Sequence, residues 1–153
     1  MTLSPDVLPT FSAMLRSAIG DLLEPSAGSF LEMFAEDGVM EFPYAPPGSV
    51  KVLHGRSALA DHLKRFPEIL SIDGFSVPQV WRTDTPGTVI LEMECKGRGI
   101  RTGEPYDQTY ISVVTTKDGR IQRYKDYWNP LVVLRAIGGS DALKQVMGES
   151  NHA

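Results

Sequence analysis

Two side chains in the sequence could carry acid–base chemistry, and the first is Asp126. It stands in the stretch RYKDYWNPL, residues 123–131, directly beside aromatic residues. A carboxylate in apolar surroundings costs free energy unless it is paired, is hydrogen-bonded, or responds by raising its pKa. A raised pKa near neutrality is what a general acid or base requires. In a purely structural role, the same carboxylate would accept backbone or tyrosine hydrogen bonds and tie down a loop.

The second candidate is His62, in the stretch GRSALADHLKRF, residues 55–66. Four residues of this stretch recur at helical spacing and form one stripe: Leu59, His62, Leu63 and Phe66. The spacing predicts that His62 faces the interior. If this helix covers the strand that carries Asp126, the two side chains could share a cavity, and His62 could shuttle a proton. A histidine on an apolar face is also commonly a satisfied core residue.

Other chemistry is weakly represented in the sequence. The three histidines are scattered, so no metal site at recognisable spacing is predicted; His54 is expected in a loop or cap, and His152 at the terminus. Cys95 is alone in a strand-like pattern and is expected to be a buried, inert thiol. The chain has neither a phosphate-binding glycine loop nor a Gly-x-Ser-x-Gly motif. The sequence therefore predicts an activity without a metal or another cofactor.

Composition places further bounds on the protein. A chain of 153 residues with 42% hydrophobic and 22% charged residues is typical of one globular domain, expected over residues 1–153. The net charge of −4, with scattered Lys and Arg, argues against a nucleic-acid partner. The sequence has no apolar run of about 20 residues and no basic-then-apolar N-terminus. We therefore expect no membrane partner and a cytoplasmic location.

The elements that must position these residues follow from periodicity and turn signals. Apolar stripes predict helices over 10–23, 29–35 and 55–66, with a capping box from Ser29 to Glu32 and Ser57 as an N-cap. Strands are predicted over 39–44, 50–54, 75–83, 87–99, 106–116 and 120–128. A helical turn over 131–139 and a helix capped by Ser140 end the chain. This order predicts an α+β domain with helices over one face of a mostly antiparallel sheet.

The Asp118-Gly119 pair predicts a two-residue hairpin loop between the last two strands. Lys117 would then pair with Arg120, and Ile111 with Asp126. One face of the hairpin would carry Thr109, Ile111, Val113, Tyr124, Asp126 and Trp128. The other, facing water or a partner subunit, would carry Tyr110, Ser112, Val114, Arg123, Lys125 and Tyr127. A register slip of one residue would reverse these assignments.

Three stretches resemble the SnoaL-like branch of the nuclear-transport-factor-two-like superfamily: FLEMFAEDGVMEFP, HGRSALADHL and GRIQRYKDYWNPLVVLRAIGG. The resemblance covers about residues 8–138. It implies a curved mixed sheet around a cone-shaped pocket, about three helices, and a homodimer packed through sheet faces. Known members include ketosteroid isomerases, polyketide cyclases, an epoxide hydrolase, dehydratases and the phenazine-biosynthesis A/B proteins.

The functional pattern that matches most closely is that of the phenazine-biosynthesis A/B proteins. They carry a His in a Gly-x-x-x-Leu-x-x-His helix and an acid on the last strand, which correspond here to His62 and Asp126. Two departures are that the family acid is Glu, and that Phe66 replaces a Ser one turn after the His. Ketosteroid isomerase fits less well, since its general base falls on Phe42 and its oxyanion-hole acid on Ile111.

The sequence therefore predicts a cofactor-free enzyme that isomerises, cyclises, condenses or dehydrates a small, largely apolar cyclic or polyketide-like metabolite. Asp126 would be the base or acid, and His62 its partner. The residues expected to line the ligand site are Met14, Phe42, Tyr44, Phe66, Met93, Ile111, Tyr124 and Trp128. The alternative is a non-catalytic small-molecule-binding or dimeric scaffold domain of the same fold.

Overall fold

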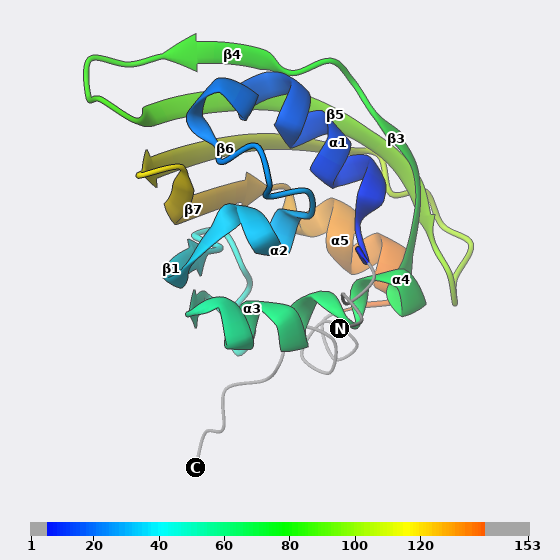
Figure 1. The fold of residues 1–153 in the computed structure, drawn as a ribbon. Coiled ribbons are helices and arrows are strands. Elements are labelled where there is room, and N and C mark those ends of the chain that lie inside the picture. The colour runs from blue at the N-terminus through cyan, green and yellow to red at the C-terminus, as the bar shows by residue number, and fades with distance from the viewer. Residues whose placement is uncertain (1–5, 140–153) are drawn as a thin grey trace.

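The computed structural model describes residues 6–139, which form a curved sheet with helices packed on its concave side (Figure 1). The helices are α1 (Pro9–Ile19), the 3-10 turn η1 (Gly20–Leu22), α2 (Phe30–Met33), α3 (Arg56–Leu63), α4 (Phe66–Ile69) and α5 (Pro130–Ile137). The strands are β1 (Phe34–Glu41), β2 (Val52–His54), β3 (Leu70–Phe75), β4 (Gln79–Arg82), β5 (Thr88–Gly99), β6 (Gln108–Lys117) and β7 (Arg120–Trp128). The helix predicted from Ser140 lies outside the described residues.

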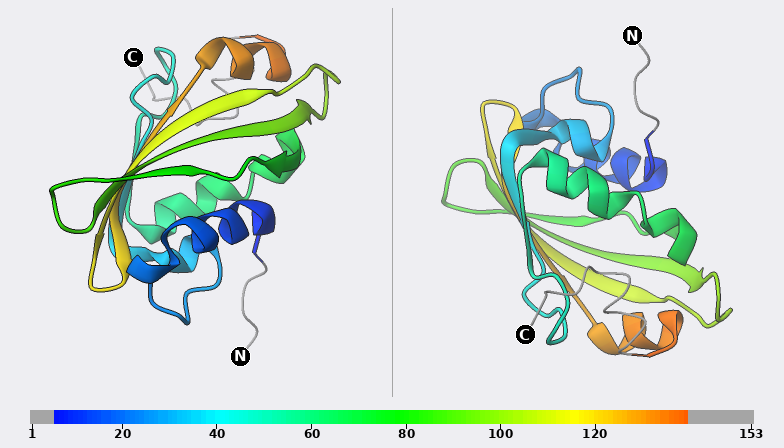
Figure 2. Two further views of the ribbon diagram at one scale, coloured as in Figure 1. Left: turned by 90° about the horizontal axis from the view of Figure 1, so that it is seen from above. Right: turned by 90° about the horizontal axis from the view of Figure 1, so that it is seen from below.

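The sheet has the strand order β2-β1-β7-β6-β5-β3, and β4 pairs with β5 beside β3. Neighbours are antiparallel except β1 and β7, which run parallel. Figure 2 shows α1, α2 and α3 together over one face, and α5 apart from them at one end of the strands. The predicted α+β class, with a curved and mostly antiparallel sheet that helices cover, is confirmed.

The boundary between α2 and β1 differs from the prediction. The capping box forms as expected, since Ser29 accepts a hydrogen bond from the Glu32 backbone while the Glu32 side chain accepts one from the Ser29 backbone. The helix nevertheless ends at Met33, and the strand begins at Phe34. Phe34 pairs with Ile121 of β7, and an irregular stretch separates this pair from the regular pairing of Val39–Glu41. Similarly, α3 begins at Arg56 after Gly55, so Ser57 lies in its first turn and does not cap it.

The turn of the β6–β7 hairpin forms as predicted. Asp118 and Gly119 have φ angles of 52° and 79°, the two positive values that a tight primed turn requires, and Lys117 pairs with Arg120. Beyond the turn the predicted register is wrong. Thr116 pairs with Ile121 and Thr115 with Arg123, so Gln122 is an extra residue in β7, and this bulge shifts every later pair by one residue.

The shift places Ser112, and not Ile111, opposite Asp126. Ile111 is 41% exposed on the convex face, whereas Ser112 and Val114 are fully buried on the concave face. On β7 the predicted inner side is correct, since Tyr124, Asp126 and Trp128 are all buried. One extra residue in one strand therefore reverses the faces of β6 and leaves those of β7 unchanged.

Aromatic side chains hold the first two helices against β7. The Phe30 ring makes edge-to-face contacts with Phe11, Phe34 and Tyr124, with centroids 4.8, 5.0 and 5.6 Å away. Such pairs stabilise a core by about 0.5–1.5 kcal/mol beyond the area they bury. Cys95 is buried on β5, and this burial raises its thiol pKa to about 12. The thiol therefore stays protonated, as an inert core residue would.

Candidate active site

A cavity of about 370 Å³ lies between the concave face of the sheet and the helices. Its wall combines β6 and β7 with residues from α1, α3, α4, α5 and β3. Most of the lining is apolar and includes Phe11, Phe42, Phe66, Phe75, Trp128 and Val133. Ligand sites in proteins commonly have this size and an apolar lining with a few polar groups.

Asp126 is the one carboxyl group that lines this cavity among the described residues, and it is 9% exposed. Its Oδ1 accepts a hydrogen bond of 3.3 Å from the Ser112 hydroxyl, which in turn accepts one of 2.9 Å from the Tyr124 hydroxyl. Burial raises the pKa of Asp126 to about 7, although the Ser112 hydrogen bond acts in the opposite direction. The side chain can therefore exchange a proton near neutral pH.

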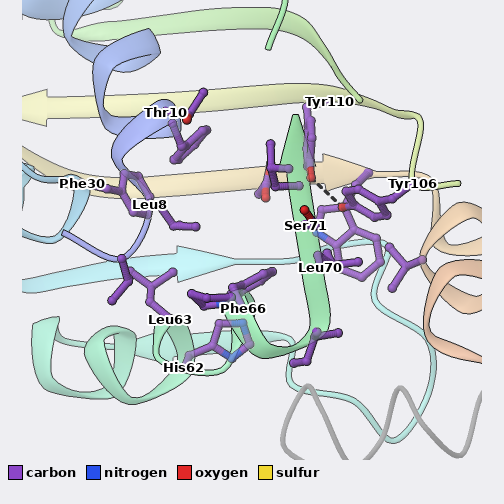
Figure 3. Close-up of a pocket in the computed structure, with 18 of the residues that line it drawn as sticks. Leu8, Thr10, Phe30, His62, Leu63, Phe66, Leu70, Ser71, Tyr106 and Tyr110 are labelled. Atoms are coloured by element: carbon purple, nitrogen blue, oxygen red, sulfur yellow. Dashed lines mark hydrogen bonds between the residues drawn. The ribbon is translucent and has the colours of Figure 1, made fainter. Parts of the chain in front are cut away.

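His62 lines the cavity from α3, beside Phe66 (Figure 3), and is 7% exposed. Its ring lies 5.4 Å from that of Phe42 and 5.3 Å from that of Phe66. Burial lowers its pKa to about 4, and the charge of Arg65 acts in the same direction. The imidazole is therefore neutral at pH 7. Its buried Nε2 has no hydrogen-bond partner within the described chain.

Asp126 and His62 line the same cavity but are not hydrogen-bonded to each other. Among the residues that the structure describes, the partner of Asp126 is Ser112, while Nε2 of His62 has none. The cavity thus offers two separate polar groups to a ligand.

Two further polar groups were not anticipated from the sequence. Tyr106, just before β6, and Tyr110, on its concave face, join their hydroxyls at 2.6 Å (Figure 3). Burial raises the pKa of both phenols well above 10. The predicted register had turned Tyr110 outward. Their four-residue spacing on an extended chain, which places both side chains on one face, was the available signal.

The remaining predicted ligand residues divide into three groups. Phe42, Phe66 and Trp128 line the cavity. Three others are buried in the core and are not part of the cavity lining: Met14, Met93 and Tyr124.

The expectation that Tyr44 and Ile111 face the cavity is wrong. Both line a shallow groove on the convex face, where Tyr44 is 60% exposed and its ring lies 5.2 Å from that of Tyr127. The bulge accounts for Ile111, and Tyr44 lies beyond the end of β1.

Between residues 6 and 139 no three His, Cys, Asp or Glu side chains lie together as a metal site would need. Over the same residues no helix is long and apolar enough to cross a membrane.

The model of the SnoaL-like domain matches residues 24–124, well over half of the chain. The chain belongs to the SnoaL-like family. This confirms the resemblance found in the sequence, and the curved sheet around an apolar cavity is the fold expected of a SnoaL-like protein.

Several relatives of this SnoaL-like chain have known sequences or structures. The uncharacterized protein YesE of Bacillus subtilis is 48% identical over 126 residues, covering 82% of this chain and 86% of YesE. The uncharacterized PhzA/B-like protein PA3332 of Pseudomonas aeruginosa is 39% identical over 121 residues, which cover 79% of this chain and 85% of PA3332. A solved Bacillus subtilis structure, described as a candidate isomerase, has a TM-score of 0.73 and 45% identity. The match covers 89% of this chain and 98% of the Bacillus subtilis chain.

The phenazine biosynthesis-related protein PhzB2 of Pseudomonas aeruginosa is a more distant structural neighbour. It has a TM-score of 0.63 and 22% identity, covering 84% of this chain and 88% of its own. At this identity the likeness extends to the fold alone, and one fold supports many activities. The chemistry of this SnoaL-like protein is therefore argued from its own cavity.

Proposed function

We propose that this protein catalyses proton transfer on a small, largely apolar cyclic or polyketide-like molecule held in the cavity. The observation that carries the proposal is a buried carboxyl group, Asp126, with a pKa of about 7 in the wall of an apolar cavity. Isomerisation, aldol-type cyclisation, condensation and dehydration can each begin when a base removes a proton next to a carbonyl. A carboxylate can perform this step without a cofactor.

The surrounding residues suit this role. Apolar lining such as Phe42 and Trp128 would remove water from the ligand and strengthen electrostatic interactions in the site. The Ser112 hydroxyl orients the carboxylate of Asp126. Neutral His62, with its unpaired Nε2, can form a hydrogen bond to a polar atom of the ligand. A positioned general base of this kind typically contributes about 10²–10⁴-fold in rate.

Names of relatives agree with this class of chemistry. The 45%-identical Bacillus subtilis structure is described as a candidate isomerase. PhzB of Pseudomonas fluorescens, named as a phenazine biosynthesis protein, is 29% identical over 114 residues. Both descriptions fit enzymes of small-molecule metabolism.

The alternative is a protein that binds a small molecule without transforming it. The chain of hydrogen bonds from Tyr124 through Ser112 to Asp126 favours this alternative, because it would also suit a carboxyl group with a structural role. The two functions differ in one respect that can be measured. Only a catalyst accelerates the exchange of carbon-bound hydrogens of its ligand with solvent.

Hydrogen exchange therefore tests the proposal without knowledge of the product. The protein is incubated in D₂O with 2-tetralone, 1-indanone or cyclohex-2-enone, and deuterium uptake next to the carbonyl is followed by NMR. We expect the wild type to accelerate exchange of at least one ketone over buffer, and Asp126→Asn to lose about 10²–10⁴-fold of that acceleration. Equal acceleration by both proteins, or none by the wild type, would contradict the proposal.

We also propose that two copies of the chain associate through the convex face of the sheet. This face carries exposed apolar side chains, among them Tyr44, Trp81 and Ile111. Tyr44 and Ile111 line the shallow groove described above. Exposed apolar patches of this kind commonly mark sites of association.

A further inference from the structure

The hydroxyl pair of Tyr106 and Tyr110 is the feature that the proposed function leaves unused. Both side chains line the cavity, and Tyr106 is 3% exposed. Their oxygens are 2.6 Å apart, so one hydroxyl donates to the other. Two phenols carry two hydroxyl hydrogens, and their mutual bond uses one. The pair keeps a second hydrogen that it can donate elsewhere.

The side-chain amide of Gln108, which is hydrogen-bonded to Tyr106, does not accept that hydrogen. The side-chain oxygen of Gln108 already accepts from the backbone N–H groups of Thr109 and Asn129, at 3.2 and 2.8 Å. An amide oxygen has two lone pairs, so this one is occupied. Gln108 can offer the tyrosines only a donor. The unused hydrogen of the pair is thus available to an acceptor in the cavity.

The charges around the cavity restrict what that acceptor can be. No Lys or Arg side chain is among the described residues that line the cavity. His62 is neutral, both tyrosines are protonated, and Asp126 is the group that becomes negative. A buried carboxylate ligand would find no cation to balance its charge, and Asp126 would repel it. An uncharged oxygen needs no balancing cation and is not repelled by Asp126.

The Tyr106–Tyr110 pair lies near the candidate base, Asp126. Ser112 lies opposite Asp126, and Tyr110 is two residues before Ser112 on the same concave face of β6. Diagonal neighbours of this kind have Cα atoms about 7–8 Å apart. The charge of Asp126 reaches both phenols, since it contributes to raising the pKa of each. One small ligand could therefore contact the carboxyl group and the hydroxyl pair together.

We propose that the Tyr106–Tyr110 pair is a subsite for an uncharged oxygen of the substrate, a carbonyl or a hydroxyl, and that the cavity excludes carboxylates. Calling this ligand a substrate rests on the proposed function. The binding preference itself does not, so it can be tested without any turnover.

Three probes with one ring system separate the contributions: 2-naphthol, naphthalene and 2-naphthoate. Their dissociation constants are measured at pH 7 by fluorescence titration. For the wild type we expect 2-naphthol to bind about 5–10-fold more tightly than naphthalene, the effect of one neutral hydrogen bond. We expect 2-naphthoate to bind more weakly than either. Tighter binding of 2-naphthoate than of 2-naphthol would overturn the proposal, and this comparison needs no variant.

Variants then assign the preference to the pair. In Tyr106→Phe/Tyr110→Phe the naphthol-to-naphthalene ratio should fall to about one, while naphthalene itself still binds and reports an intact cavity. The control Tyr127→Phe alters a tyrosine that lines the convex groove and is not part of the cavity lining. It should keep the wild-type ratio. An unchanged ratio in the double variant would refute the subsite, whereas failure of the proposed function would appear only in the exchange assay on Asp126→Asn.

Discussion

The two faces of β7 give neighbouring charged residues opposite surroundings. Asp126 points into the cavity and is 9% exposed, while Lys125 and Arg123 point to the convex side. There Arg123 forms an ion pair with Glu41 at a partly exposed position. Within residues 6–139 Asp126 has a hydroxyl partner and no cation, and burial dominates its pKa. Sequence neighbours on a strand therefore do not neutralise each other, because alternate side chains face opposite sides.

The largest expected effect is on the rate of ketone exchange, and it distinguishes the concave face of β7 from its convex face. In the ketone-exchange assay, Asp126→Asn should reduce acceleration by about 10²–10⁴-fold, because an amide cannot take up the proton. Lys125→Gln, one residue away on the opposite face, should stay within about twofold of wild type. Comparable losses in the two variants would show that the concave position of Asp126 has no special role.

The second effect is on stability and depends on pH. The pKa of Asp126 is raised from 3.8 to about 7 on folding, so the folded state binds its proton more tightly than the unfolded state does. Its contribution is fully present below about pH 4 and is lost as pH rises through about 7. His62, with a pKa lowered to about 4, acts in the opposite direction, since its contribution is lost as pH falls through that value.

Comparison with Asp126→Asn isolates the carboxyl group, because both proteins keep His62. From pH 4 to pH 8 the free energy of unfolding of the wild type should fall relative to the variant by up to about 4 kcal/mol. Urea denaturation at the two pH values measures this difference. If the difference in unfolding free energy between the two proteins were the same at both pH values, the pKa of Asp126 would be that of an ordinary carboxyl group.

A smaller effect is expected from the hydroxyl that supports the carboxylate. Ser112→Ala removes the hydrogen bond that lowers the Asp126 pKa, and leaves the buried Tyr124 hydroxyl without its acceptor. We expect a loss of about 1–3 kcal/mol in unfolding free energy. The midpoint of the exchange–pH profile should also move upward. Thr109→Ala, on the exposed convex side of the same strand, should change neither quantity.

The sequence was sufficient to predict most elements, but not α4, β3 or the exact pairing of the strands. Apolar periodicity located the stripe of α3 with His62, and the Asp118-Gly119 turn located the last hairpin. Both signals are local. The inward side of Tyr124, Asp126 and Trp128 was also predicted, because alternate residues of a strand share one face.

The bulge at Gln122 of β7 was not predicted, because the Asp118-Gly119 turn alone sets a register without an extra residue. Its consequence was large for the candidate site. It exchanged Ile111 for Ser112 as the neighbour of Asp126, and it brought Tyr110 into the cavity. His62 was located from the periodicity of α3 alone, and Asp126 kept its predicted side because the register change reversed the faces of β6 and not those of β7.

The smallest effect on chemistry is expected for the convex face. Ile111→Glu adds a charge on the exposed side of β6 and should leave ketone exchange within about twofold of wild type. If two copies associate there, it should also shift the protein from dimer to monomer in sedimentation experiments, because a buried unpaired charge destabilises an interface. A wild-type protein that sediments as a monomer would contradict the proposed association.

The central claim is that burial holds the pKa of the Asp126 carboxyl group near 7, and NMR titration can test it directly. The ¹³C resonance of the Asp126 side-chain carboxyl is followed from pH 3 to pH 10 in wild-type protein, with Asp126→Asn identifying the signal. The structure predicts a midpoint at about 7. A midpoint near 4, the value of an exposed aspartate, would contradict the account.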